Sequence, residues 1–506
     1  MKQSIKLFVA VLSLLTISLV SASTPVGAAP NDPVSIPDAG LSACILATTT
    51  HANPSYLTEA EAANVPNIGY PYGQCRSQNI SSLEGLQYFT SANYMMLGSN
   101  NISDLTPLAN LSNLRDLELS NNKVTNITPL TNLDLTRIDI SYTGTCSGLS
   151  LAPLSGMTSL LWLDVRDCPL TNLSALSGLT NLITLYLTNS NISDISPLSG
   201  LASLVTLQLL DNPISDLSPI AGLAALNIFS VGGQAAGNRL LDNADFNVIA
   251  GLTSLTRLYI YGSQISNISP ITSMNNLAHL SINNSLLVDI SPLASLTDLV
   301  WLTLTYNNIG NISPLANLTS LGLLGLAHNN ISSLSPVSGL TALTRLDAGN
   351  NKISDISPLA TLTNLTEVYL SSQTVALSNA TAGQPYANPF RAINGSFIPT
   401  SGSKLTYDTN TNTWNFTENG AQTGAWSTEI TLGGFTGYFN GTFTQTQVPA
   451  STNPGDDNGD GSGTIPGVPN TGALRILTSG PAIYVVFGLA LLATIVGIRK
   501  TIQSRR

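Results

Sequence analysis

Charged residues and histidine are both scarce in this 506-residue chain. Asp, Glu, Lys and Arg together account for 9% of the residues, and there are three histidines. The 28 acidic residues outnumber the 18 basic ones, so the net charge at pH 7 is −10. Because nucleic acids and anionic membrane surfaces attract positive charge, this balance argues against both as partners.

The scarcity of histidine also bears on catalysis. His51, His279 and His328 lie in three separate places, and no Cys or carboxylate pair accompanies them at metal-ligand spacing. The sequence shows no Gly-rich phosphate loop and no recognisable Ser-His-Asp arrangement. We therefore expect no catalytic residues, no metal site, no cofactor and no enzyme.

What the chain does contain is a 22-residue repeat over residues 79–372. Turns that read Ser-Pro-Leu or Thr-Pro-Leu mark the repeat. Two intervals are longer, one of 24 residues from Pro129 to Pro153 and one of 29 from Pro219 to Val248. A period this regular predicts a solenoid, in which each repeat forms one coil stacked on its neighbours.

One copy of the repeat shows how a coil would fold. Leu114, Leu117, Leu119 and Asn122 spell L-x-x-L-x-L-x-x-N, and polar residues alternate with the leucines as in a strand. The proline that follows cannot extend a hydrogen-bonded ladder, so we expect an irregular or 3₁₀ return on the convex side. Stacked coils would form a parallel sheet on the concave face, with strands about 4.8 Å apart. The pattern resembles the leucine-rich repeat.

The residue that ends this motif has a structural role of its own. An asparagine there can bond backbone groups of the turn and of the next coil, which satisfies amides that have no sheet partner. It recurs at Asn100, Asn122, Asn212, Asn307, Asn329 and Asn351. Cys146 and Cys168 occupy the same position in neighbouring coils, where their Cα atoms would be about 5 Å apart. We predict a coil-to-coil disulfide; two buried thiols are the alternative.

Residues 1–29 have the features of a secretory signal peptide. Lys2 and Lys6 precede an apolar run, and small residues suited to cleavage follow it. The alternative, a transmembrane anchor, is less favoured because the apolar run is short.

Residues 31–78 lack the repeat and should form an α-helical cap that shields the first coil. Thr58 and Glu61 predict a capping box for a helix that runs to about Val65. Cys44 and Cys75 bracket the segment, and in an exported protein we expect them to pair rather than remain free thiols.

The long interval after Pro219 predicts a loop inserted near the strand edge, because it contains Val231-Gly232-Gly233 and Gly237-Asn238. Such a loop either contacts a partner or is a tolerated insertion.

Residues 373–449 change to short alternating runs that include aromatics, which predicts a small β-sandwich. The expected strands cover 405–407, 413–416, 428–432 and 441–444, and Asn419-Gly420 and Asn440-Gly441 are expected to be turns. Residues 450–467 predict a flexible spacer. This spacer faintly matches a calcium loop, but Gly467 stands where the last acidic ligand is required.

Residues 468–506 form a recognisable C-terminal signal. Val468, Pro469, Asn470, Thr471 and Gly472 precede an apolar stretch and a basic tail. The pentapeptide resembles the sortase sorting signal L-P-x-T-G, with Val in place of Leu. The resemblance implies cleavage between Thr471 and Gly472 by a sortase cysteine and transfer to the cell wall. The alternative is a plain membrane anchor that retains Gly472 onward.

Taken together, these parts resemble the internalin family of Gram-positive surface proteins. The resemblance is carried by the lead-in at 82–88, the repeat phrase at 191–198, the cap start at 36–39 and the runs 413–415 and 439–445. It implies a leucine-rich-repeat solenoid with an N-terminal α cap and a C-terminal Ig-like domain at 373–449. The cap cysteines, the short spacer and the absence of wall-binding repeats depart from the family pattern.

Strand residues between the buried leucines should face the concave surface and bind a partner there, since exposed Trp and Tyr on a rigid sheet supply interface hot spots. The candidates are Asp116, Glu118, Trp162, Asp164, Tyr186, Arg257, Tyr259, Tyr261, Trp301, Arg345 and Tyr369. They suggest an acidic N-terminal patch followed by an aromatic centre. The alternative is that the tryptophans only cover neighbouring leucines.

The leading interpretation is a secreted, cell-wall-anchored surface adhesin that binds an extracellular protein receptor. The alternative is a structural or glycan-binding surface protein. In both cases a sortase would be the processing enzyme and the cell wall the attachment site.

Overall fold

The computed structural model of the protein describes residues 32–50, 52–69, 73–142, 146, 148–233, 241–432 and 435–449. These residues belong to one compact unit, Met1–Ala450. The predicted signal peptide, His51, the spacer and the sorting signal with its pentapeptide lie outside the described residues, as does the middle of the insertion, 234–240.

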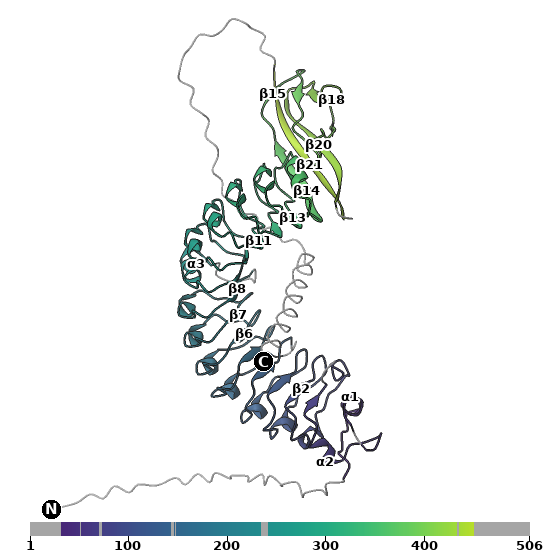
Figure 1. The fold of residues 1–506 in the computed structure, drawn as a ribbon, viewed down its shortest axis with the longest axis vertical. Helices are drawn as coiled ribbons and strands as arrows, with labels where there is room; N and C mark the ends of the chain where they lie inside the picture. Colours follow the sequence, from purple (N-terminus) through teal and green to yellow (C-terminus); the bar gives the residue numbers. More distant parts are fainter. Residues whose placement is uncertain are drawn as a thin grey trace, which may run out of the picture. The chain divides into compact units, whose positions relative to one another are not determined.

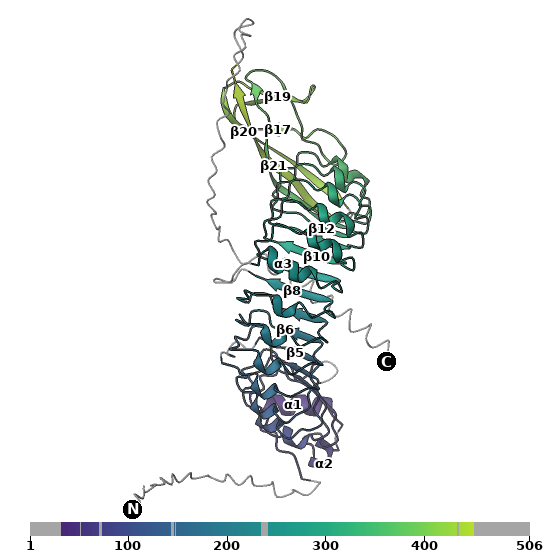
Figure 2. The ribbon, with the colours of Figure 1, turned by 90° about the vertical axis from the view of Figure 1, so that its left-hand side faces the viewer.

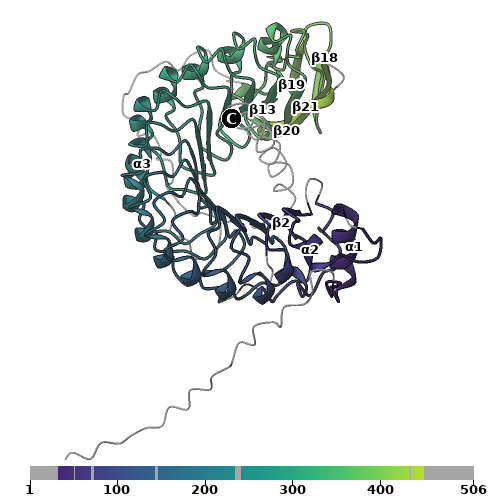
Figure 3. The ribbon, with the colours of Figure 1, turned by 60° about the horizontal axis from the view of Figure 1, so that its bottom comes forward.

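A parallel sheet is the backbone of the structure, as predicted. Its strands pair in chain order, and equivalent leucines align; Leu280, for example, lies opposite Leu258 and Leu302. Figures 2 and 3 show the strands stacked along the inner, concave side of the solenoid. The strands are β1 (Asn67–Ile68), β2 (Tyr94–Met96), β3 (Asp116–Glu118), β4 (Arg137–Asp139), β5 (Trp162–Asp164), β6 (Thr184–Tyr186), β7 (Thr206–Gln208), β8 (Ile228–Gly232), β9 (Arg257–Tyr261), β10 (His279–Asn283), β11 (Trp301–Thr303), β12 (Leu323–Gly325), β13 (Arg345–Asp347) and β14 (Glu367–Ala376).

Short 3₁₀ helices form the convex side, which confirms the predicted return. Most of them have the repeat proline as their second residue, where its fixed φ suits the first turn of a helix. They are Leu86–Tyr88, Thr106–Leu108, Thr128–Leu130, Ala152–Leu154, Ser174–Leu176, Ser196–Leu198, Ser218–Ile220, Ser269–Ser273, Ser291–Ser295, Ser313–Leu315, Ser335–Val337 and Ser357–Thr361.

Between the two sides, the repeat leucines form one continuous apolar core. Leu114, Leu117 and Leu119 are fully buried, and so are their equivalents in the other coils. No single coil could bury this surface alone, so stacking is what stabilises each coil.

A second ladder, made of side chains, joins the coils at the end of the strands. The Asn307 carboxamide accepts from Leu287 N at 3.1 Å and donates to Ile282 O at 2.8 Å and to Leu304 O at 3.0 Å. These bonds reach the preceding coil rather than the next one. The position is occupied in order by Asn100, Asn122, Cys146, Cys168, Ser190, Asn212, Ser263, Ser285, Asn307, Asn329, Asn351 and Gln373. We call this set the side-chain ladder.

Cysteine and glutamine fit this ladder in different ways. Cys146 is bonded to Cys168, with their Cα atoms 5.4 Å apart. Gln373 makes the same set of bonds as an asparagine, accepting from Ile353 N and donating to Ala348 O and Leu370 O. Strand β14 therefore runs through the boundary predicted at 372/373.

The long coil after Pro219 differs from the predicted simple loop. In this coil β8 is five residues long, and the coil carries the helix α3 (Asn243–Ala250; Figure 1). The helix begins with a capping box formed by Asp242 and Asp245. An Asx residue followed three positions later by an acid is the sequence signal that predicts such a helix start.

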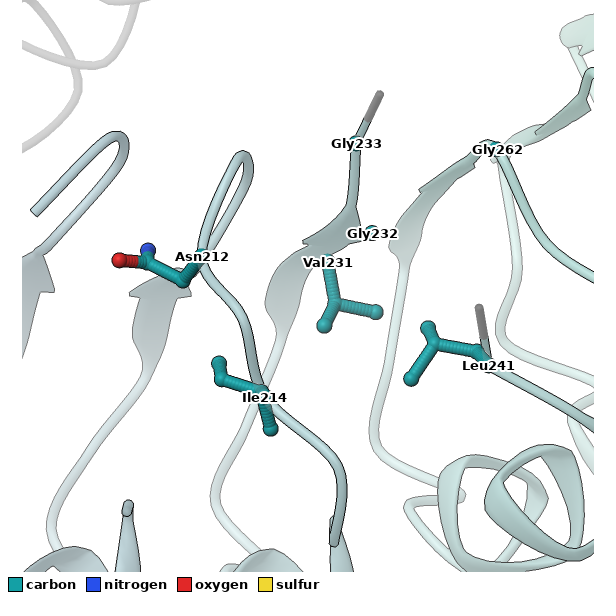
Figure 4. Close-up of a pocket in the computed structure, with 7 residues that line it drawn as sticks. All are labelled: Asn212, Ile214, Val231, Gly232, Gly233, Leu241 and Gly262. Atoms are coloured by element: carbon teal, nitrogen blue, oxygen red, sulfur yellow. The ribbon is translucent and has the colours of Figure 1, made fainter. Parts of the chain in front are cut away.

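At this coil the ladder position falls on residue 234, which lies outside the described residues. Ile214 N donates to Asn212 O within its own turn. A small pocket lies here, lined by Asn212, Ile214, Val231, Gly232, Gly233, Leu241 and Gly262 (Figure 4). Gly232 has φ of 94°, and a Cβ there would lie 2.1 Å from Tyr261 O, so glycine is required.

The described residues of the N-terminal segment include the helices α1 and α2. In α1 (Ala39–Thr48), which is capped by Asp38, Leu41 and Ile45 are fully buried. The predicted capping box of Thr58 and Glu61 is present, but α2 (Glu59–Ala62) ends earlier than predicted. Cys44 and Cys75 are bonded, with their Cα atoms 5.1 Å apart.

The C-terminal strands form two sheets that meet at an aromatic cluster. Phe390 stacks on Trp426 at 3.9 Å between ring centroids, and Trp414 of one sheet lies 4.9 Å from Phe443 of the other. In the larger sheet β21 pairs with β14, β15 and β20, and β20 pairs with β17; the smaller has the order β16-β19-β18. The strands are β15 (Ala380–Thr381), β16 (Tyr386–Ala387), β17 (Thr400–Ser401), β18 (Leu405–Asp408), β19 (Thr413–Phe416), β20 (Gly420–Leu432) and β21 (Phe435–Val448).

The turn predicted at Asn440-Gly441 is wrong, because both residues lie inside β21. Glycine is needed there for packing rather than for a turn: a Cβ at Gly441 would lie 2.4 Å from Gln373 O and 2.6 Å from the Trp426 ring.

Adjacent asparagines allow a matched test of the side-chain ladder. Asn307→Ala leaves buried backbone groups without partners, so we expect the free energy of unfolding to fall by about 1–3 kcal/mol. Asn308→Ala removes an exposed amide and should change stability by less than about 0.5 kcal/mol. Urea unfolding followed by circular dichroism measures both. Equal effects would show that the ladder is not a source of stability.

Candidate functional site

The strands line the concave side of the solenoid (Figure 3). The predicted partner-binding residues lie at the first or third position of a strand, or at the fifth in the case of Tyr261, and alternate with the buried leucines. Tyr369 is exposed. Glu118 and Asp164 are buried. The remaining candidates are partly exposed: Asp116, Trp162, Tyr186, Arg257, Tyr259, Tyr261, Trp301 and Arg345.

The prediction that Glu118 and Asp164 present an open acidic patch is wrong. Glu118 accepts from Arg76 Nε at 3.0 Å and from Gly98 N at 3.1 Å. Asp164 accepts from Arg166 Nη2 at 2.6 Å. A carboxylate that loses water must gain donors, and the nearest guanidinium groups supply them.

A third carboxylate, Asp139, lies between these two in the sheet register. Arg137 bridges it to Asp116, with its guanidinium nitrogens 2.9 Å from Asp116 Oδ1 and 3.4 Å from Asp139 Oδ2. Burial raises the pKa of Asp139 to about 6, and the charge of Asp164 adds to this rise; a hydrogen bond from Ser141 and the charge of Arg137 oppose it.

Aromatic rings cover this carboxylate row. The Arg137 Cζ lies 4.0 Å from the centroid of the Trp162 ring, and Trp162 meets Tyr186 edge-on at 5.5 Å. The Arg166 Cζ lies 5.0 Å from the Tyr186 ring and 5.3 Å from the Tyr142 ring. Cation–π contacts thus hold Trp162 and Tyr186 in place. The two side chains cover the sheet and are also half-exposed, so both interpretations of these aromatics apply in part.

The centre of the concave face has a different character. Strands β8, β9 and β10 each have five residues, so the sheet is wider here than at the three-residue strands on either side. Arg257, Tyr259 and Tyr261 lie along β9, and His279 of β10 faces Trp301 of β11 with ring centroids 5.7 Å apart. Burial raises the pKa values of both tyrosines. Burial and the charge of Arg257 lower the pKa of His279, so its ring is neutral at pH 7.

Two buried polar atoms in this centre have no hydrogen-bond partner among the described residues. They are Ser230 Oγ on β8, opposite Tyr259, and His279 Nδ1 on β10, opposite Arg257. We call Tyr259, Tyr261, His279 and Trp301 the central aromatic strip.

Sequence alternation missed one aromatic pair altogether. Tyr306 and His328 follow β11 and β12 and stack at 3.9 Å between ring centroids, with planes 10° apart. They lie outside the strands, so the period-two pattern does not reach them. The available signal was an aromatic residue directly before the ladder asparagine, where other coils have Asn, Asp or Ser.

At the C-terminal end of the concave face, Arg345 pairs with Glu367 at 3.1 Å and lies 5.2 Å from the Tyr369 ring.

In the part of the chain that the structure describes, no three His, Cys, Asp or Glu side chains group as metal ligands. Within the same residues, no helix has the length and apolar character needed to cross a bilayer.

Comparisons with known proteins agree on the repeat and on the fold. Residues 180–247, 323–361 and 341–379 match the family described as Leucine Rich repeats (2 copies). An internalin (inlF) from Listeria monocytogenes is 30% identical, covers 68% of this chain and 92% of its own, and gives a TM-score of 0.53. The functional domain of InlJ from Listeria monocytogenes, which includes a cysteine ladder, is 21% identical with coverages of 81% and 97% and a TM-score of 0.56, a likeness of fold. No curated protein sequence matches the chain.

The raised pKa of Asp139 predicts a pH-dependent stability. The folded chain holds this proton up to about pH 6, whereas the unfolded chain loses it near pH 4, so the contribution of Asp139 becomes unfavourable as pH rises between these values. Asp139→Asn should therefore raise the free energy of unfolding at pH 7, by at most about 3 kcal/mol, and leave it unchanged at pH 4. Arg137 keeps its contact with Asp116 in this variant.

Thermal unfolding at the two pH values measures the effect. Asp134→Asn, at an exposed carboxylate, is the control and should have little effect at either pH. Equal stability of Asp139→Asn and the parent protein at pH 7 would contradict the assigned cost of burying this charge.

Proposed function

The chain belongs to the internalin-like leucine-rich-repeat proteins, and on that premise we propose that it is a surface recognition protein that binds an extracellular protein through the central aromatic strip. It has no catalytic role in this proposal. Proteins of this repeat class generally bind other proteins, and the concave sheet is the rigid element that this chain offers for contact.

The observation that carries the proposal is the chemistry of the central aromatic strip. Half-exposed Tyr and Trp side chains bury a large area at low entropic cost, and such residues with arginine dominate the energy of protein interfaces. Arg257 lies at the start of the same strand as Tyr259 and Tyr261.

The carboxylate row to the N-terminal side has a supporting role in this proposal. Glu118 and Asp164 accept hydrogen bonds from arginines and backbone amides, so their charge is compensated within the chain. Ser141 and Arg137 compensate the charge of Asp139 only in part. Removing one partner of such a buried pair costs more than the pair contributes. These residues thus hold Trp162 and Tyr186 in position rather than contacting a partner themselves.

The remaining parts of the chain fit a wall-anchored protein. In our proposal, residues 1–29 direct secretion, 31–78 cap the first coil and 373–449 form an Ig-like domain that closes the last coil. A sortase then cleaves between Thr471 and Gly472 and joins the protein to the cell wall. A structural or glycan-binding surface protein is the alternative function.

Alanine substitution of Tyr259, Tyr261 and Trp301 together tests the binding surface. A partner is first isolated by pull-down with the purified chain from surface proteins of candidate cells, and its affinity is then measured by calorimetry. Loss of three half-buried aromatics should weaken binding at least about 100-fold, because each hot spot contributes about 2 kcal/mol.

The control for this experiment replaces Leu286 and Val288, which are exposed apolar residues outside the strands. This control variant should bind the partner with the affinity of the parent protein. An affinity that the triple substitution leaves unchanged would refute the central aromatic strip as the binding surface.

The anchoring proposal has its own test. Mass spectrometry of the mature protein from the producing cells should give a C-terminus at Thr471 linked to wall material. Thr471→Ala should leave the protein uncleaved and shift it from the wall fraction to the membrane fraction, because the carbonyl that is attacked lies in an altered motif. A mature protein that retains Gly472 onward would instead be a membrane-anchored one.

A further inference from the structure

One residue between each strand and its ladder position adopts the left-handed backbone conformation. Its φ lies between 53° and 65° in coil after coil. The non-glycine residues at this position are Ser99, Asn121, Tyr142, Asp167, Asn189, Asp211, Asn284, Tyr306, His328, Asn350 and Ser372. Asn and Asp tolerate this conformation because their short side chains bond locally, whereas a bulky tyrosine is strained in it. The presence of tyrosine at this strained position therefore needs an explanation.

Tyr306 and His328 occupy this position in adjacent coils. Their stacked rings lie 3.9 Å apart and are nearly parallel, and 41% of Tyr306 is exposed. No hydrogen bond joins the Tyr306 hydroxyl or the His328 ring to another described residue. The two rings therefore cover one face of each other and leave only their outer faces and edges for a ligand, at a position outside the apolar core. Strained residues retained in this way cluster at functional sites.

The residues on either side of the ring pair, at the same position of the adjacent coils, are neutral amides. Asn284 precedes Tyr306 at the equivalent position, and Asn350 follows His328. Both are exposed, and neither side-chain amide bonds another described residue. This differs from Asn121 and Asn189, whose amides donate to Ser99 Oγ and Asp167 Oδ1 in the neighbouring coil. Each of the two flanking amides thus offers two N–H donors and one acceptor oxygen to a ligand.

A flat ring pair beside unused amides favours one class of ligand. The negative face of an aromatic ring attracts the weakly positive C–H groups of a sugar ring, and the hydroxyl groups at the sugar's edge pair with amides that both donate and accept. Asn284 and Asn350 carry no charge to oppose that of a charged ligand. Asp347, the carboxylate that interacts with His328, accepts from Gly349 N at 3.2 Å and interacts with Arg345. We propose that Tyr306, His328, Asn284 and Asn350 form a binding site for a neutral saccharide, separate from the central aromatic strip.

The test uses the residue that the backbone itself prefers. In the double variant Tyr306→Asn with His328→Asn, the coils gain a side chain suited to the left-handed conformation, so the melting temperature should stay equal or rise. The full chain and the variant are applied to an array of immobilised neutral hexose and N-acetylhexosamine oligosaccharides. The parent protein should bind a subset of these, and the variant should lose at least ten-fold in apparent affinity.

Two controls separate this site from others. Tyr142→Asn changes the same backbone position seven coils from Tyr306 and should leave saccharide binding unchanged. The triple substitution in the central aromatic strip should also leave it unchanged, so failure of the receptor proposal and failure of this one can be told apart. The proposal is overturned if the parent protein binds no neutral saccharide on the array, or if the double variant binds them equally. It is also overturned if the double variant loses only binding to a protein partner.

Discussion

The side-chain ladder is the constraint on which the rest of this structure depends. Every coil turns sharply after its strand and leaves amides and carbonyls that no sheet neighbour can satisfy. Asn307 and its equivalents satisfy them with one carboxamide that reaches the preceding coil. Because the bonds recur at the same place, they keep the strands in register and so bring equivalent side chains into columns on the concave face.

Columns of equivalent side chains explain why the concave face has two regions of different chemistry. Glu118, Asp139 and Asp164 fall in one column, so their charges lie next to one another and need arginines for compensation. That region is occupied by its own ion pairs. The column continues through Tyr259, where the sheet widens and the neighbouring rings are aromatic and neutral. A partner would displace few strong protein–protein contacts there, which is why recognition is assigned to this region rather than to the acidic one.

Periodicity alone was sufficient to predict the solenoid, the parallel sheet and the concave position of Tyr259 and Trp301, because burial of the leucines dictates all three. It could not predict that Glu118 and Asp164 are buried, since alternation gives the face of a residue but not its ion-pair partner, here Arg76 from outside the repeat. Gln373 was read as the start of a new region because it departs from the consensus, although its longer amide makes the same bonds. The stack of Tyr306 on His328 depends on the left-handed backbone conformation of both residues, and this conformation leaves no hydrophobic pattern in the sequence.

Hydroxyl-radical footprinting of the intact protein, alone and with its bound partner, tests the central claim most directly. It reports side-chain exposure at each aromatic ring without any substitution. The account predicts protection of Tyr259, Tyr261 and Trp301 in the complex, with the convex 3₁₀ side unchanged. Protection confined to the convex side, with these three rings as reactive as in the unbound protein, would contradict it.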